Sequence, residues 1–130
     1  MATFASQPYQ PQDAREFLEY MQRMMSEVAR LQREGRIPDD AGTHSLLDFW
    51  RMMVTHVRSD VAGVPAASKT PITTSWEMSE AEYKRTWAHY DTILSLLEIL
   101  DLRGAVKLEA SPATMRVIQA LYKGQFVDQT

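Results

Sequence analysis

The chain has 130 residues, a length that fits one domain. Apolar residues make up 45% of it and charged residues 24%, proportions that exclude disorder along the whole chain. The formal net charge of −3 argues against a protein that coats nucleic acid, and the absence of cysteine excludes disulfides, thiolate metal sites and cysteine nucleophiles.

The sequence carries no feature that predicts export or a membrane segment. The first twelve residues contain neither a charged residue nor an apolar run, so they lack both parts of a signal peptide. The longest apolar runs have only a few residues, far fewer than the ~20 needed to cross a bilayer. We therefore expect a cytoplasmic protein that does not bind membranes.

The N-terminal segment 1–12 contains Pro8 and Pro11 and is expected to be a flexible arm. Asp13 followed by Glu16 fits a capping box, so a first helix is predicted to begin at Asp13 and to end before Gly35. Its apolar residues are three and four positions apart, which predicts one buried stripe made of Ala14, Phe17, Met21, Met24, Val28 and Leu31.

A second helix is predicted to begin near Asp40 or Thr43 and to end at Gly63. One side of it is apolar and should be buried, with Leu46, Leu47, Trp50, Met53, Val54, Val57 and Val61. The following segment 63–77 holds two prolines and many small polar residues. We expect a long mobile loop there, with at most a short extended piece around Ile72.

Ser79 followed by Glu82 predicts the start of a third helix that ends near Leu102 and buries Leu97. Ser111 followed by proline predicts a short fourth helix that ends at Gly124, beyond which residues 125–130 should fray. The predicted fold is therefore all-α: one domain over 13–124, with three long helices and a short C-terminal helix.

The three histidines do not predict a metal site. His44 and Asp48 are four residues apart, as are His56 and Asp60, but the two pairs lie about 18 Å apart along one helix. Zinc requires three or four converging ligands. The sequence also has no nucleophile elbow, no P-loop and no Gly-x-Gly-x-x-Gly motif. We therefore expect no metal, no cofactor and no enzymatic activity.

The second helix carries an apolar ridge beside its core stripe. Phe49 is expected to be half-buried, whereas Met52 and His56 should face solvent, with Arg51 and Arg58 as a polar rim. An exposed apolar ridge between charged residues is typical of a protein-binding site, and methionine adapts readily to a partner. We predict a partner site with Phe49 as its anchor and Met52 as its adaptable contact.

The first helix is apolar over a wider arc than one packing face requires. Leu18 and Met25 widen its stripe to about 180°, compared with the roughly 100° that one face needs. Within one bundle, such a width can mean that the helix contacts two neighbouring helices. Otherwise Leu18 and Met25 are predicted to contact a second copy of the chain in a twofold homodimer.

These features favour a small non-enzymatic regulatory protein that binds and occludes a larger protein, such as an adaptor, a chaperone, an immunity factor or an anti-activator. The alternative is a DNA-binding regulator that uses the helix 112–123, where Arg116, Gln119 and Lys123 share one face. The long connection before that helix and its few cationic side chains make nucleic acid the weaker partner. A small helical-bundle enzyme or a metal protein is the third interpretation, with His89 as candidate acid or base.

Overall fold

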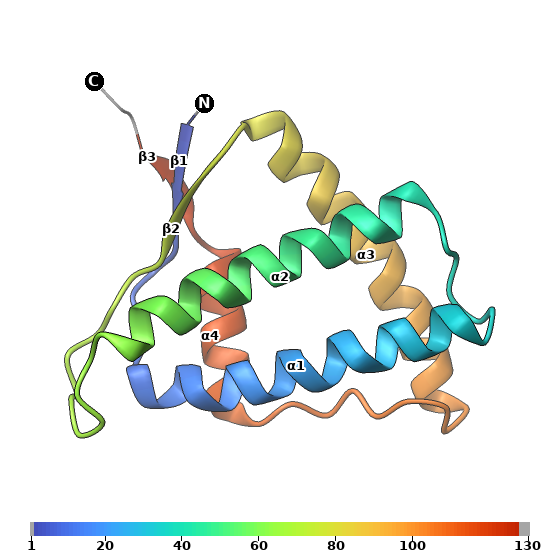
Figure 1. Ribbon diagram of the computed structural model, residues 1–130, viewed down its shortest axis with the longest axis horizontal. Coiled ribbons are helices and arrows are strands. Elements are labelled where there is room, and N and C mark those ends of the chain that lie inside the picture. The colour runs from blue at the N-terminus through green and yellow to red at the C-terminus, as the bar shows by residue number, and fades with distance from the viewer. Residues whose placement is uncertain (1, 128–130) are drawn as a thin grey trace.

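The computed structural model describes residues 2–127, which form four helices and a three-stranded antiparallel sheet (Figure 1). In chain order the elements are β1 (Ala2–Ala5), α1 (Pro11–Arg33), α2 (Ala41–Ala62), β2 (Ser75–Met78), α3 (Glu80–Leu102), α4 (Pro112–Tyr122) and β3 (Gln125–Val127). The predicted all-α class is wrong, because strands from both ends and the middle of the chain join in one sheet.

The segment expected to be a flexible arm supplies the central strand of this sheet. Strand β1 pairs on one side with β2 and on the other with β3, so that Phe4 lies opposite both Trp76 and Phe126. The Phe4 side chain is only 1% exposed. Burial of this aromatic residue holds the segment in place, although a four-residue strand is too short for its pattern to stand out in the sequence.

The expected mobile loop 63–77 is also more ordered than predicted. Its last residues belong to β2, where buried Trp76 and Met78 alternate with exposed Ser75 and Glu77. Ile72 forms an isolated antiparallel bridge with Tyr9, as the extended piece predicted around Ile72 requires. Residues 125–127, expected to fray, form β3, and the remainder of that segment lies outside the described residues.

Three of the four helix starts have the caps that the sequence predicts. The side chains of Asp40, Ser79 and Ser111 accept hydrogen bonds from the backbone N–H three residues later. Helix α1 differs: it begins at Pro11, and its N-cap residue makes no side-chain cap. Proline at the first helical position is already suited to a helix start, so the predicted capping box at Asp13 does not form.

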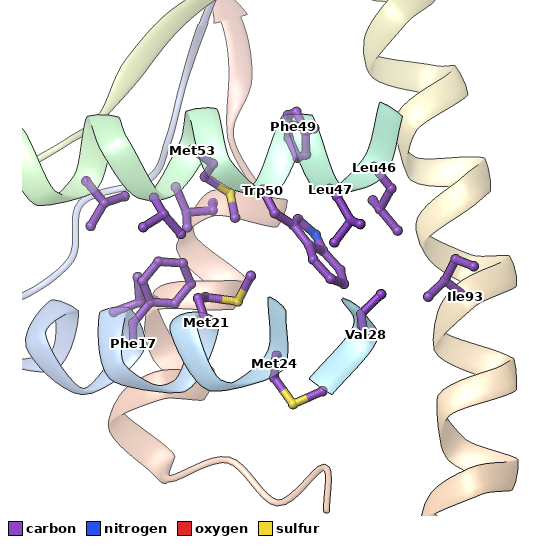
Figure 2. Packing of buried hydrophobic residues seen from close by; sticks show 14 of the residues in the cluster. Phe17, Met21, Met24, Val28, Leu46, Leu47, Phe49, Trp50, Met53 and Ile93 are labelled. Carbon is purple, nitrogen blue, oxygen red and sulfur yellow. The ribbon is translucent and has the colours of Figure 1, made fainter. Parts of the chain in front are cut away.

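The core lies mainly between α1 and α2 (Figure 2). All six residues of the predicted α1 stripe and all seven of the predicted α2 stripe are buried. Figure 2 shows Phe17, Met21 and Met24 on α1 below Trp50 and Met53 on α2. Helix α1 also packs against α4, whereas α3 packs chiefly against α2.

A continuous group of aromatic rings joins the sheet to α3 and α4. The ring of Phe4 lies 4.9 Å from that of Tyr83 and 5.0 Å from that of Trp76, measured between centroids. Further along α3, Trp87 contacts Phe49 at 6.1 Å and Tyr122 at 4.6 Å. Edge-to-face and tilted ring pairs of this kind stabilise a fold beyond the area that they bury. The N-terminal half of α3 is thus attached through aromatic side chains.

The irregular segment 103–111 runs along α1 (Figure 1). Side chains of α1 donate hydrogen bonds to its carbonyl oxygens: Arg30 to Ala105 (2.7 Å), Tyr20 to Leu108 (3.2 Å) and Arg23 to Glu109 (3.3 Å). Backbone carbonyls outside regular structure need such partners. The charged face of α1 therefore anchors this connection in addition to facing solvent.

Candidate functional site

A cleft of about 410 Å³ lies between α2 and the N-terminal half of α3. Helix α2 contributes Asp48, Phe49 and Met52 to its walls, and α3 contributes Glu82, Arg85 and His89. Met78 at the end of β2 lines the same cleft. It is thus built from α2 on one side and from the consecutive elements β2 and α3 on the other.

The apolar part of the cleft consists of Leu46, Phe49, Met52 and Met78. Phe49 is 6% exposed, and its ring meets those of Trp76 and Trp87 edge-on at 6.0 and 6.1 Å. The prediction of a half-buried Phe49 is wrong, because the sheet and α3 cover the side of α2 that was expected to reach solvent. Met52 is half-buried and packs against the core, so it is less exposed than predicted.

The polar part of the cleft contains charges of both signs. Asp48 forms an exposed ion pair with Arg51 at 3.0 Å, which draws Arg51 to the margin of the cleft. Arg85 forms no ion pair with any described residue. An unpaired guanidinium next to apolar side chains can bind a carboxylate by donating two parallel hydrogen bonds to its oxygens.

His89 closes one end of the cleft against the first turn of α2. A Cβ atom at Gly42 would lie 2.3 Å from the imidazole ring, so glycine at position 42 leaves room for the ring in this rotamer. The nearby Asp40 carboxyl has a lowered pKa, chiefly because it accepts a hydrogen bond from the backbone N–H of Thr43, with a smaller favourable interaction from His89. The imidazole thus lies at the positive end of α2, beside its N-cap.

The other predicted site residues lie outside the cleft. The exposed ring of His56 stacks on Trp76 at 6.3 Å between centroids, with 25° between the ring planes. Arg58 is exposed and does not line the cleft. Of the five predicted partner-binding residues, the structure therefore brings Phe49 and Met52 into the cleft and places Arg51 beside it.

The histidine–aspartate pairs weighed as metal ligands do not form. His44 pairs with Asp39, whereas Asp48 pairs with Arg51. Residues 2–127 contain no group of three or more histidine, aspartate or glutamate side chains arranged to hold a metal ion.

Among the cleft residues that were not assigned to the site from the sequence are Met78, Glu82, Arg85 and His89. The last three are spaced i, i+3 and i+7, which places them on one face of a helix, so this face was visible in the pattern. Met78 could not be found in this way, since its position depends on β2.

Helix α4 has little free positive charge for a role in DNA recognition. Arg116 binds Asp13 of α1 through two hydrogen bonds, of 2.9 and 3.2 Å. These bonds raise the pKa of the guanidinium further. The opposite side of α4 is buried against α1, with Ala113, Val117 and Leu121 in the core. Of the described residues on the face proposed for DNA, Lys123 alone is a cation without an ion pair.

The two residues predicted to mediate self-association, Leu18 and Met25, are half-buried and pack against the core. Each therefore offers less apolar surface to a second copy than its helix position suggested. The homodimer stays a prediction.

None of the helices within residues 2–127 is both long enough and apolar enough to cross a membrane. Comparison of the chain with protein-family models, with curated proteins and with solved structures gave no match.

Proposed function

We propose that this protein is a non-enzymatic interaction module that binds a segment of a larger partner protein in the cleft between α2 and α3. The observation that carries the proposal is that Met52 and Met78, from separate elements, line one surface cleft together with Arg85, which forms no ion pair with any described residue. Methionine side chains are unbranched and polarizable, so they adapt to a partner's side chain better than rigid apolar residues do.

The chemistry of the cleft specifies the kind of segment that it would accept. An apolar side chain of the partner would enter between Met52 and Met78, above the ring of Phe49. A carboxylate one or two positions away in the partner would bind Arg85. We therefore infer that the cleft binds a short segment of the partner that combines an apolar residue with an acidic one. Binding would occlude this part of the partner.

The arrangement of His89 supports binding over catalysis. A general base is usually oriented by a hydrogen bond from a further side chain, often a carboxylate. No hydrogen bond joins His89 to any carboxylate among the described residues. Its ring lies instead against the backbone at Gly42.

Site-specific photocrosslinking tests the proposal. A photoreactive residue at position 52 should trap a partner in lysate of the native host, whereas the same residue at Met115 should not. Met115 is the matched control, because it is a 42% exposed methionine on α4 and does not line the cleft. The proposal is wrong if the partner is trapped equally from both positions.

Affinity for the trapped partner then tests the individual contacts. Met52→Glu should weaken binding about 30-fold, since truncation of an interface hot spot costs about 2 kcal/mol. Met115→Glu makes the same chemical change on α4 and should leave affinity unchanged. Arg85→Glu should weaken binding too, and a partner variant with its acidic residue changed to lysine should restore it. Normal binding by correctly folded Met52→Glu would place the site elsewhere.

A salt titration against random duplex DNA tests the alternative function. Contacts to several phosphates would give steep salt dependence. Because Arg116 is engaged by Asp13, we expect only weak binding. Tight, steeply salt-dependent binding that is lost in Lys123→Glu would favour the DNA-binding regulator instead.

A further inference from the structure

A second, separate cavity of about 60 Å³ lies on the other side of α2, where α1, α3 and α4 meet. Its walls carry no charged side chain. Three methionines, Met21, Met24 and Met53, line it together with the rings of Trp50, Trp87 and Tyr90. This cavity shares no lining residue with the cleft described above.

The cavity lies where the backbone of α3 approaches that of α2 far more than that of α1 or α4. Side chains alone therefore fill the space between α3 and the α1–α4 pair. Half-buried Tyr90, Leu94 and Ile118 mark the part of the lining that reaches the surface.

The lining offers water few polar partners; one of them is the indole N–H of Trp87, which has no hydrogen-bond partner among the described residues. The Tyr20 hydroxyl already donates a hydrogen bond to the carbonyl oxygen of Leu108. Burial raises the pKa of both Tyr20 and Tyr90, so both phenols stay uncharged at neutral pH. A buried water needs two to four polar partners, and apolar cavities that lack them stay dry and bind apolar molecules.

We propose that this cavity is a binding site for a small uncharged apolar ligand, such as an aromatic ring or the end of an aliphatic chain. Its volume is several times the ~15 Å³ that one water molecule requires. An engineered apolar cavity of about 150 Å³ accepts benzene or xenon. Xenon fits the present volume, and a ring is admitted when the flexible methionines change rotamer.

Methyl NMR of the full chain, labelled at the methionine methyl groups, tests the site directly. On addition of xenon, and separately of benzene, the Met21, Met24 and Met53 signals should shift and saturate. Met78 and Met115 lie outside the cavity and serve as internal references within the same sample. Benzoate should cause no shift, because the cavity offers no charged partner for its carboxylate.

Filling the cavity should abolish binding. Ile118→Phe places a ring in the lining, and at least a tenfold loss of benzene affinity is expected. Met115→Phe, on the exposed side of the same helix, should bind as the unchanged protein does. If Ile118→Phe does not fold, Leu94→Phe fills the cavity from α3 and must give the same loss.

Three outcomes would overturn the proposal. In the first, no methyl group responds to xenon or benzene. In the second, all methionine signals shift in parallel, as weak contacts over the whole surface would cause. In the third, a folded cavity-filling variant binds benzene as well as the unchanged protein does.

Discussion

An added Cβ atom would be tolerated differently at Gly124 and at Gly42. A Cβ at Gly124 would lie 2.4 Å from the carbonyl oxygen of Ala5 and 2.6 Å from the ring of Phe4. At Gly42 the obstacle is the imidazole of His89, the mobile end of an exposed side chain. The first contact involves the backbone of the central strand, which cannot move without loss of the sheet.

Gly124→Ala should therefore destabilise the protein by about 1–3 kcal/mol, the usual cost of overpacking. Gly42→Ala should not, because His89 can rotate away and alanine favours a helix over glycine by about 1 kcal/mol. Urea unfolding of both variants measures the difference. Equal loss of stability in the two variants would mean that His89 is held rigidly in the cleft wall.

Leu97 and Leu102 provide a second comparison at the scale of single residues. Leu97 is 2% exposed and lies in the core, as predicted, whereas Leu102 on the same helix is 89% exposed. Leu97→Ala should cost roughly 2–5 kcal/mol through lost burial and a larger cavity. Leu102→Ala should stay within about 0.5 kcal/mol of the unchanged protein. If Leu97→Ala and Leu102→Ala had the same melting temperature, α3 would have to be rotated about its axis.

Among the elements, the helices could be predicted from the sequence and the strands could not. Helix signals extend over 11 to 23 residues, so an error at one end, such as that at Pro11, leaves the buried stripe unchanged. Strand β2 alternates over only four residues between prolines and a helix cap. Its pairing depends on β1, which lies some seventy residues earlier in the chain.

The contrast between long helix patterns and short, distantly paired strands also explains how much of the candidate site could be predicted. Phe49 and Met52 were found because they lie off the core stripe of their own helix. Met78 and Arg85 join them only through the sheet and through the crossing of α3 over α2. When several elements form a site, the sequence pattern predicts only those site residues that lie together on one element.

Phe4→Ala tests whether the first strand is a structural element or a loose arm. The Phe4 ring contacts those of Trp76, Tyr83 and Phe126 at 5.0, 4.9 and 5.4 Å. Its removal should cost about 3–5 kcal/mol. Val127→Ala, a change at a 46% exposed position of the same sheet, is the control and should cost little. An unchanged melting temperature for Phe4→Ala would restore the interpretation of a flexible arm.

For the molecule as a whole, the buried tyrosines set an alkaline limit to stability. Burial raises the pKa of Tyr9, Tyr20 and Tyr90 above the ordinary value. Unfolded tyrosines ionise near pH 10, whereas these three stay protonated in the native state until higher pH. Below about pH 10 both states are protonated, so stability does not change on this account; above it, the unfolded state gains by ionising and stability falls.

Urea midpoints measured from pH 8 to pH 11 should therefore be level up to about pH 10 and then decrease. Phenolate absorbance of the native protein should show a matching set of tyrosines that ionise late. A midpoint that rises above pH 10 would contradict the burial of these hydroxyls.

The sheet also fixes when the chain can finish folding during its synthesis. Thr3 on β1 pairs with Val127 on β3, so one half of the sheet joins residues from nearly opposite ends of the described chain. While the chain grows, β1 can pair with β2 before β3 has been synthesised, and the second edge of β1 stays open until then. Contacts this distant in sequence form slowly and expose unpaired strand edges in the meantime. Nascent chains that stop before β3 are therefore expected to depend on chaperones, and full-length chains to be released from them.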